Sequence, residues 1–544
     1  MSGSSALPVV ESLLDLRGPQ FKANWESWQP ILEKFEAASK YATTEATPSS
    51  QTKHQSRGQL LARDRISLLL DEDSPFLELC AYAGFQQEGA PPCANLIAGI
   101  GSICARPCLV LSHIPTQSGG AWNEFTVPKQ NRVTEIATEN GLPIVALVQS
   151  AGVFLPQQFK VFHAGGQIFR DLAKRSQLGH QSCAIVFGSS TAGGAYHPAL
   201  SDYSIFVKDQ AQVFLGGPPL VKMATGETVD AETLGGAATH AKITGLADQI
   251  ADDENSRFDA IRKGREWVAA LGQPIEQTVS VVDSPVPPRY SPDDILSLVD
   301  PDIRKPFDMK EILLRIVDDS RLSDFKPSYG ANMLTCFASI MGHGVGIIAN
   351  QVPVINTDEA SKGAQFIRLC NQSNLPIIFL HNVTGFMVGT KAEHAAIIKK
   401  GAQLVSAVSC STVPHISIIL GASYGAGNYA MCGRPYKPRF LFTWPIGRCS
   451  VMGPDQLAGV MQTIEANSAK SKGKEVDDAA VEARVQSLKD SVQRDSESYR
   501  TSAALLDDGV IDPRDTRDVL GICLEVVKIP GVQGAAAHRV LARM

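Results

Sequence analysis

Two stretches of this chain occur twice at one spacing. Residues 142–147 read Leu-Pro-Ile-Val-Ala-Leu and residues 375–380 read Leu-Pro-Ile-Ile-Phe-Leu, and the glycine-rich run 188–196 has a counterpart at 421–429. The step from 142 to 375 equals the step from 188 to 421, and we call this common step the repeat offset. Because two unrelated coincidences would not keep the same spacing, the pattern predicts two copies of one α/β unit, each with its own glycine-rich turn.

The length and the local patterns agree with this duplication. A chain of 544 residues is too long for one hydrophobic core. Short apolar segments alternate with helix-patterned ones, which predicts sheets covered by helices. The expected strands are 97–103, 109–112, 144–148 and 183–187 in the first copy, and 338–341, 345–349, 377–380 and 416–420 in the second. The expected helices are 57–70, 131–140, 364–371 and an exposed one at 470–500.

Composition shifts mark the expected domain boundaries. A Pro-rich segment separates the copies, and residues 42–53 are rich in Thr, Ser and Ala. The predicted order is a helical arm and linker (1–56), an N-terminal domain (57–282), a Pro-rich linker (283–292) and a C-terminal domain (293–544).

The overall charge excludes some partners. A net charge of −6 without a Lys/Arg tract argues against nucleic acid or an anionic membrane as the main partner. The eleven cysteines are scattered and form no metal-ligand pattern, so no metal is predicted. No apolar run reaches membrane-spanning length, and no mitochondrial leader is seen, which favours a cytoplasmic protein. The final Ala542-Arg543-Met544 loosely resembles a peroxisomal tripeptide.

Each copy places a short apolar strand directly before a run of Gly, Ala and Ser that is expected to open a helix. Backbone N–H groups in such a turn point at a ligand, and the helix end adds positive potential, so the turn is suited to an oxyanion hole. The structural alternative is that the glycines only permit tight packing. Repetition at a fixed offset, with Gly152 and Gly385 ending the neighbouring strands, favours two oxyanion holes and therefore two carbonyl reactants.

Three long motifs carry a family resemblance. Residues 216–227, 384–389 and 423–434 closely resemble the carboxyltransferase β subunit of biotin-dependent acyl-CoA carboxylases, with the methylcrotonoyl-CoA carboxylase type most similar. The resemblance covers about residues 57–544 and is densest in the C-terminal half. It implies an α/β fold of tandem duplicated crotonase-like spiral domains. It also implies that the N-terminal half binds acyl-CoA and that the C-terminal half of another subunit binds carboxybiotin.

The resemblance also assigns roles to residues. The amides of Gly194 and Ala195 are expected to hold the acyl thioester oxygen, and those of Ala426 and Gly427 the biotin ureido oxygen. Lys129 and Arg132 are at an expected basic helix start, where they either pair with CoA phosphates or form a solvated helix face. The other expected substrate-binding residues are Ser150, Gly152, Gly193, Phe386 and Tyr424. His197 and His240 follow glycine-rich turns, and we favour structural roles for both.

The expected partners follow from what the chain lacks. It has no Met-Lys-Met biotin-attachment site, since Val221-Lys222-Met223 is the nearest sequence, and it has no P-loop signature. A separate biotin carboxylase and biotin carrier subunit is therefore expected, and a homo-oligomer, a hexamer by resemblance.

The N-terminal half departs from the family pattern after its second strand. The family usually has Asp-Ser-Gly-Gly-Ala there, whereas Ala151, Val153 and Phe154 add bulk beside the expected thioester. Three hypotheses follow. The first is a biotin-dependent carboxyltransferase that acts on a 3-methylcrotonoyl-CoA-like thioester. The second is a biotin-independent relative that decarboxylates, hydrolyses, transfers or condenses a thioester or β-keto substrate, for instance in secondary metabolism. The third is a catalytically silent assembly subunit.

Overall fold

The computed structural model describes residues 7–255, 257–271, 285–471 and 478–527, and its chain forms two compact units. The N-terminal unit comprises residues 37–275 and 503–505, and the C-terminal unit comprises residues 1–36, 276–502 and 506–544. Helix α1 (Pro19–Ala42) contributes to both.

The N-terminal unit is built on one eight-stranded sheet with the order β1-β2-β3-β4-β5-β6-β8, in which β7 also pairs with β5. Strands β2 and β3 form an antiparallel hairpin, and β3 through β6 run parallel. The strands are β1 Leu77–Glu78, β2 Leu96–Ile103, β3 Arg106–His113, β4 Ile144–Ser150, β5 Ser182–Thr191, β6 Tyr203–Val207, β7 Gln212–Phe214 and β8 Gln249–Ala251.

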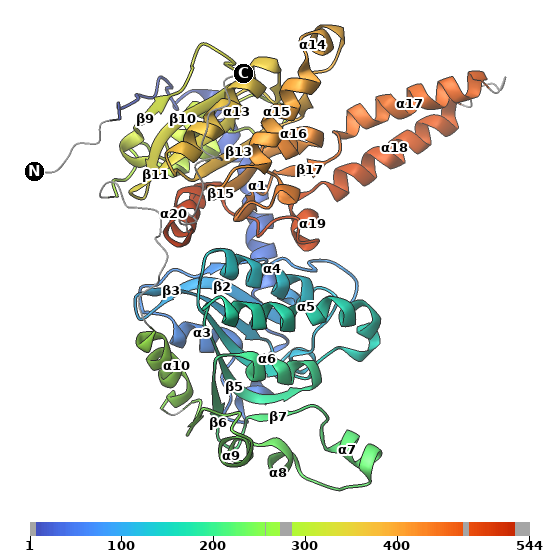
Figure 1. Cartoon of the computed structure of the whole chain (residues 1–544). Coiled ribbons are helices and arrows are strands. Elements are labelled where there is room, and N and C mark those ends of the chain that lie inside the picture. The colour runs from blue at the N-terminus through green and yellow to red at the C-terminus, as the bar shows by residue number, and fades with distance from the viewer. Residues whose placement is uncertain (1–6, 256, 272–284, 472–477, 528–544) are drawn as a thin grey trace, which may run out of the picture. The chain divides into compact units, whose positions relative to one another are not determined.

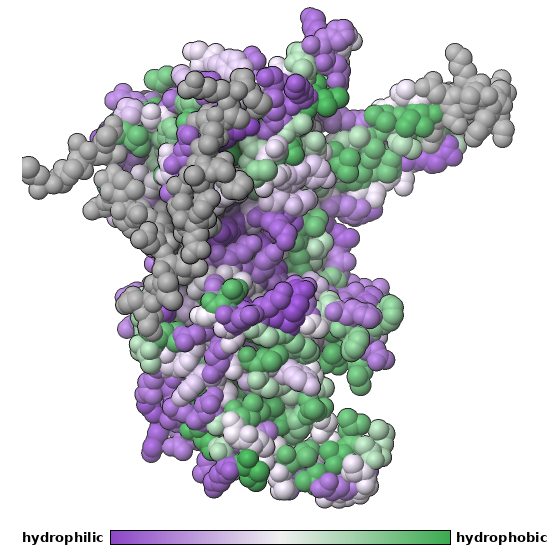
Figure 2. Space-filling view, in the orientation of Figure 1, coloured by the Kyte–Doolittle hydropathy of each residue, from purple (hydrophilic) through white to green (hydrophobic). Residues whose placement is uncertain are grey.

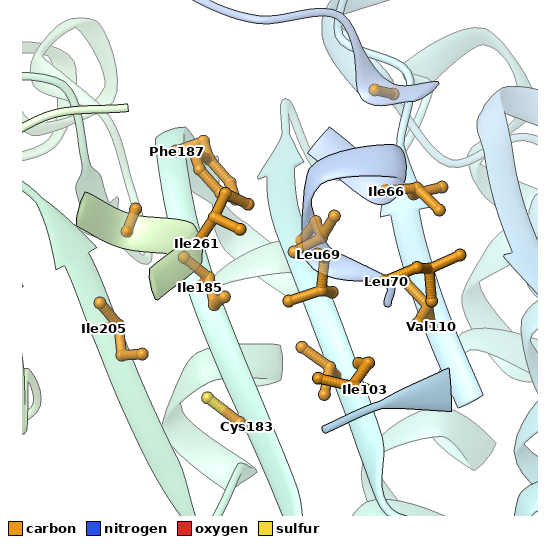
Figure 3. Packing of buried hydrophobic residues seen from close by; sticks show 14 of the residues in the cluster. Ile66, Leu69, Leu70, Ile103, Val110, Cys183, Ile185, Phe187, Ile205 and Ile261 are labelled. Carbon is orange, nitrogen blue, oxygen red and sulfur yellow. The ribbon is translucent and has the colours of Figure 1, made fainter. Parts of the chain in front are cut away.

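Helices cover this sheet (Figure 1). The helices of this unit are α2 Pro48–Gln55, α3 Ala62–Leu69, α4 Thr126–Glu139, α5 Gln158–Gln177, α6 Tyr196–Leu200, α7 Pro218–Thr225, α8 Ala231–Gly235, α9 Ala237–Thr239 and α10 Asp259–Ala270. Figure 3 shows Leu69 of α3 and Ile261 of α10 packed over Ile185 of β5 in the main core. Helices α4 and α5 enclose a second hydrophobic cluster that contains Trp122 and Val161.

The C-terminal unit repeats this strand order. Its seven-stranded sheet runs β16-β15-β13-β11-β10-β9, with β17 paired to β15, and β12 and β14 form a separate pair. The strands are β9 Leu322–Asp324, β10 Met333–Ile340, β11 His343–Asn350, β12 Val354–Ile355, β13 Ile377–Val383, β14 Gly385–Phe386, β15 His415–Tyr424, β16 Phe440–Thr443 and β17 Arg448–Ser450. The helices are α11 Ile295–Leu298, α12 Met309–Leu313, α13 Thr357–Gln372, α14 Thr390–His394, α15 Ile397–Ser409, α16 Gly425–Ala430, α17 Pro454–Ser471, α18 Asp478–Asp495, α19 Ser498–Ala503 and α20 Thr516–Val526.

The duplication extends to an irregularity in strand pairing. The β4–β5 register shifts between Val148 and Ser150, and the β13–β15 register shifts between His381 and Val383. These positions are equivalent in the two copies, because the repeat offset relates them. Each shift lies where the strand pairs with the last residues of β5 or β15 before the glycine-rich turn, so the pairing is irregular at the same point in both copies.

The bounds of several helices differ from those that the sequence predicts. The helix expected at 131–140 begins at Thr126, because the Asn123 side chain accepts hydrogen bonds from the Phe125 and Thr126 amides. The expected linker 42–53 contains the start of α2, which Thr47 caps. The single helix expected at 470–500 is instead divided among α17, α18 and α19, and α17 and α18 project together from the C-terminal unit (Figure 1).

Within the described part of the chain, no helix has both the length and the apolar character needed to cross a membrane. Residues 542–544, which resemble a peroxisomal signal, lie outside the described residues.

Candidate active site: two glycine-rich turns

The first turn joins β5 to α6. Strand β5 ends at Thr191, and residues Ala192–Ala195 form a single 3-10 turn. Gly194 and Ala195 are both buried. A Cβ added to Gly194 would lie 3.1 Å from Ser190 Oγ and 3.4 Å from Ser150 Cβ, so glycine lets the turn pack closely against the end of β4.

The end of β4 supports this turn through its own hydrogen bonds. Ser150 Oγ donates to the Gly120 carbonyl at 2.9 Å and accepts from the Gly152 amide at 3.2 Å. Gly152 has a φ of 83°, and a Cβ there would lie 2.7 Å from the Thr191 carbonyl oxygen. The structure thus brings together four predicted site residues, Ser150, Gly152, Gly193 and Gly194.

Aromatic rings flank the first turn. A Cβ on Gly193 would lie 3.3 Å from the Trp122 ring and 3.6 Å from the Phe169 ring. The ring centroids of Phe169 and Tyr196 are 5.1 Å apart, and Tyr196 is 41% exposed. Amides beside such an apolar surface are less screened by water, so their hydrogen bonds to a developing oxyanion are strengthened.

The second turn joins β15 to α16 and is packed more tightly. Strand β15 ends at Tyr424, and α16 begins at Gly425, whose φ is 53°. Ala426 and Gly427 lie in the first turn of α16, where amides have no partner within the helix. A Cβ on Gly427 would lie 2.7 Å from Val383 Cγ2 and 3.1 Å from Gly385 Cα. Glycine is therefore required here, because both the Val383 side chain and the Gly385 backbone lie too close for a Cβ.

A buried polar network lies beneath the second turn, and the sequence did not reveal it. His381 Nδ1 is 2.9 Å from Ser423 Oγ, and Asn428 Nδ2 donates to the same oxygen at 2.8 Å. Burial lowers the pKa of His381 to about 3, so its ring is neutral at physiological pH. Only the positions of these residues could have indicated the network. His381 lies on β13 and Ser423 on β15, the two paired strands whose register shifts.

Tyr424 and Phe386, the two predicted aromatic site residues, are at the second turn. Tyr424 is buried, which raises the pKa of its hydroxyl. Phe386 is partly buried, and a Cβ on Gly401 of α15 would lie 3.1 Å from its ring. A pocket of about 780 Å³ in the C-terminal unit is lined by Tyr424, Thr384, Ala422 and Arg448, among others. Because Tyr424 immediately precedes α16, this pocket lies next to the turn.

Lys129 of α4 is not arranged as the resemblance implied. Lys129 is fully buried, and its ammonium group donates to the Cys93 carbonyl at 3.2 Å and contacts Cys93 Sγ at 2.9 Å. Lys362, its equivalent in the second copy, is buried too and donates to the Gly330 and Met333 carbonyls. Both copies therefore use an internal lysine to bind loop carbonyls, and the expectation that Lys129 pairs with CoA phosphates does not hold in this structure. Arg132 pairs with Glu135 of the same helix at 2.9 Å.

His197 and His240 are both buried. His197 Nδ1 lies 3.2 Å from Gln130 Nε2, and burial lowers the His197 pKa to about 4. His240 contacts the Val213 carbonyl at 2.7 Å and the Thr244 hydroxyl at 2.8 Å.

The bulky residues after β4 lie beside the first turn. The Ala151 amide donates to the Gly119 carbonyl at 2.9 Å, and Val153 forms a parallel bridge with Trp122. The side chains of Ala151 and Phe154 are exposed. Val153 instead is partly buried and packs against the hydrophobic cluster that contains Trp122.

No group of three or more His, Cys, Asp or Glu residues that could hold a metal ion occurs among the residues that the structure describes.

Comparison with known proteins agrees with this geometry. Residues 53–538 match the carboxyl transferase domain family. A probable biotin-dependent acyl-coenzyme A carboxylase β2 subunit of Mycobacterium tuberculosis is 44% identical over 534 residues, which span 97% of this chain and 99% of that protein. A probable mitochondrial methylcrotonoyl-CoA carboxylase β chain of Drosophila melanogaster is 41% identical, over 95% of this chain and 92% of that protein. The crystal structure of the P. aeruginosa geranyl-CoA carboxylase β subunit has a TM-score of 0.87 and 37% identity, and the match covers 97% of this chain and 99% of that one.

The duplicated α/β fold with its two glycine-rich turns is thus that of a carboxyltransferase. The chain belongs to the carboxyl transferase domain family, and it is an enzyme of the acyl-CoA carboxyltransferase type. These comparisons support biotin-dependent carboxyl transfer to an acyl-CoA and do not support the biotin-independent alternative.

Proposed function

We propose that this enzyme transfers a carboxyl group from carboxybiotin to a 3-methylcrotonoyl-CoA-like acyl- or enoyl-CoA through a thioester enolate. The observation that carries this proposal is the repetition of one strand–turn–helix geometry at Gly194 and Gly427, which the repeat offset relates. Two such turns fit a reaction with two carbonyl reactants, one a thioester and the other a cyclic urea.

At the first turn, the Gly194 and Ala195 amides bind the thioester oxygen and stabilise the negative charge that forms there when the substrate loses a proton. Preorganised amide donors of this kind are worth about 3–4 kcal/mol each by analogy with other oxyanion holes. The aromatic rings of Trp122 and Phe169 limit water access beside Gly193, which further favours the enolate. Ser150 and Gly152 hold the end of β4 against the turn.

At the second turn, the residues fit a flat ureido ring. Gly427 and Gly385 lie close together and neither has a side chain, so no side chain covers this part of the turn. The amides of Ala426 and Gly427 are suited to bind a neutral carbonyl oxygen. Tyr424 and Phe386 supply apolar surface at the two neighbouring strand ends. Biotin bound here supplies the carboxyl group and a base for the substrate proton, so no Ser-His-Asp set is required from the chain.

We also propose the fold of each unit, the partner subunits and the compartment. Each unit is a crotonase-like spiral domain, which the repeated strand order supports. A biotin carboxylase and carrier subunit delivers the biotin, and the enzyme works as a homo-oligomer in which the two turns of one active site come from different copies. The cytoplasm is the expected compartment.

The reverse half-reaction tests this proposal. The purified chain is incubated with 3-methylglutaconyl-CoA, with and without free biotin, and the acyl-CoA products are followed by mass spectrometry. Loss of CO₂ only in the presence of biotin is the expected result. Turnover without biotin would contradict the proposal and return the enzyme to the biotin-independent class.

A further inference from the structure

A buried polar pair lies next to the first turn. Gln130 of α4 and His197 of α6 are each 1% exposed, and Gln130 Nε2 lies 3.2 Å from His197 Nδ1. Burial keeps the pKa of His197 at about 4, so its neutral ring accepts the hydrogen bond that the Gln130 amide donates. His197 follows Ala195 by two residues, and the bond therefore ties α6 to α4 close to the amides of the turn.

Helix α6 depends on such a contact for its direction. It has only five residues, too few for its own hydrogen bonds to keep it stable. Figure 2 shows hydrophobic residues over the area where Figure 1 places α6. Because the pair is buried away from water, its hydrogen bond is stronger than the same bond at the surface. The bond to Gln130 is therefore well placed to fix the direction of α6.

A second buried hydrogen bond lies on the other side of the turn. Trp122 Nε1 donates to His113 Nε2 at 3.1 Å, and both residues are buried. A Cβ on Gly193 would lie 3.3 Å from the edge of the Trp122 ring. The turn thus lies between the Trp122 ring and α6, and one buried hydrogen bond holds each of these neighbours in place.

The second copy is built without the pair. The repeat offset relates Gln130 to Gly363 and His197 to Ala430, so neither equivalent residue has a polar side chain. A Cβ on Gly363 would lie 3.1 Å from Leu404 Cδ1, which means that apolar packing fills this space in the C-terminal unit. The same fold therefore forms without the pair, and the pair belongs to the copy whose turn is proposed to bind the thioester.

We propose that His197 is a positioning residue for the first turn. Held by Gln130, it fixes α6 so that the amides of Gly194 and Ala195 converge on the thioester oxygen. This inference rests on the proposed function, because it takes the thioester to be bound by these two amides. In this role His197 does not touch the substrate and exchanges no proton with it.

Binding of two CoA compounds, measured without biotin, tests this role. Isothermal titration calorimetry of the full chain compares 3-methylcrotonoyl-CoA with S-(3-methylbut-2-enyl)-CoA, the thioether that lacks the carbonyl oxygen. The thioester is expected to bind about tenfold more tightly, because only its oxygen accepts hydrogen bonds from the turn. His197→Leu is expected to lower this preference to less than about threefold. His197→Asn keeps an acceptor near the Nδ1 position and is expected to keep the preference within about twofold.

Changes at the partner and at a distant histidine complete the test. Gln130→Leu is expected to act like His197→Leu and replaces it if that variant does not fold, and the double variant should be no worse than either single change. Buried His54 of α2 is the matched control, because it too makes one hydrogen bond, to the Leu60 carbonyl at 3.0 Å. His54→Leu is expected to leave the preference unchanged.

Turnover gives a second measurement of the same role. In biotin-dependent loss of CO₂ from 3-methylglutaconyl-CoA, His197→Leu is expected to lower kcat about thirtyfold and to raise KM less than about threefold. The reason for this difference is that aligned amides stabilise the enolate more than the neutral thioester.

Three results would overturn the inference. The first is equal affinity of the unaltered chain for the thioester and the thioether. The second is an unchanged preference in both His197→Leu and Gln130→Leu. The third is an equal loss in His197→Leu and His197→Asn, because the volume of the ring and not its hydrogen bond would then support the turn. A preference that His197→Leu removes, in a chain without any biotin-dependent loss of CO₂, would support the inference and contradict only the proposed carboxyl transfer.

Discussion

The two glycine-rich turns share a backbone path and differ in what surrounds it. The first is flanked by Trp122 and Phe169, and the nearest atom to an added Gly194 Cβ is a serine hydroxyl at 3.1 Å. The second is packed more tightly, since a Gly427 Cβ would lie 2.7 Å from Val383 Cγ2 and 3.1 Å from Gly385 Cα. The two copies thus keep the same turn geometry, while the packing around each turn differs. This difference is what we expect if the turns bind two different reactants.

The serines beneath the turns show the same divergence. Ser190 Oγ donates to the Gly194 carbonyl at 2.8 Å, so it stabilises its own turn directly. Ser423, the equivalent serine of the second copy, contacts His381 and Asn428 instead. The first turn is held by one local bond and the second by a buried network.

The strongest effect is expected from a branched side chain in either turn. Gly427→Val and Gly194→Val are each expected to lower kcat for biotin-dependent decarboxylation by at least about 100-fold, because the amides can no longer approach the substrate oxygen. Gly459→Val on α17 is the control, since a Cβ at Gly459 meets nothing within 4 Å. Full activity of Gly427→Val would remove the second turn from the mechanism.

Replacing each glycine by alanine compares how tightly the two turns are packed. Gly427→Ala is expected to lower kcat about tenfold more than Gly194→Ala. The new methyl group would lie 2.7 Å from Val383 Cγ2 and 3.1 Å from the Gly385 backbone, which is tighter than the 3.1 Å contact with the Ser190 hydroxyl at Gly194. Steady-state kinetics of the two variants measure this ratio. Equal losses would mean that the tighter packing of the second turn has no bearing on catalysis.

Replacing Ser190 or Ser423 by alanine compares the hydrogen bonds that support the two turns. Ser423→Ala removes a hydrogen-bond partner from His381 and from Asn428 and is expected to lower the free energy of unfolding by about 2–3 kcal/mol. Ser190→Ala loses one bond to a carbonyl and is expected to cost about 1 kcal/mol. Urea unfolding of both variants is the measurement, and a larger loss for Ser190→Ala would reverse the assignment of the buried network.

The weakest expected effect is a pH dependence of folding stability that arises from Asp507 in the C-terminal unit. Burial raises the pKa of Asp507 to about 6, even though the Thr443 hydroxyl donates to it at 2.7 Å. A raised carboxyl pKa means that the folded state holds the proton more strongly. The stability that protonated Asp507 contributes is therefore fully present below about pH 4 and is lost as the pH rises through about 6. Asp507→Asn is expected to be more stable than the unaltered chain at pH 8, by on the order of 1 kcal/mol, and to gain nothing at pH 4.

Thermal unfolding at the two pH values checks this prediction. Asp71 of the N-terminal unit is the opposite case, because hydrogen bonds from the Ala105 and Cys104 amides outweigh partial desolvation and lower its pKa to about 2. Its contribution is present above about pH 4 and is lost as the pH falls to about 2. Asp71→Asn should therefore lower stability at pH 8, and a gain there would contradict the assignment.

The repeat and the turn positions were predictable from sequence because glycine and short apolar runs have strong local consequences. Gly193, Gly194 and Gly427 are needed wherever a strand turns into a helix in close contact with its neighbour. The role of Lys129 was not predictable in this way. A lysine at a helix start looks solvated in sequence, and only its contacts with Cys93 show that it is an internal donor.

Sequence alone was enough to establish the duplication, the α/β class, the two turns and the family, because each depends on residues that are close in the chain or on an exact spacing. The surroundings of each turn became known only from three-dimensional packing. Trp122, Phe169 and Gly193 meet only after α5 packs against α6, and His381 reaches Ser423 across two strands. Contacts of this kind join residues that are far apart in the chain, and their energies depend on packing that local sequence patterns do not encode.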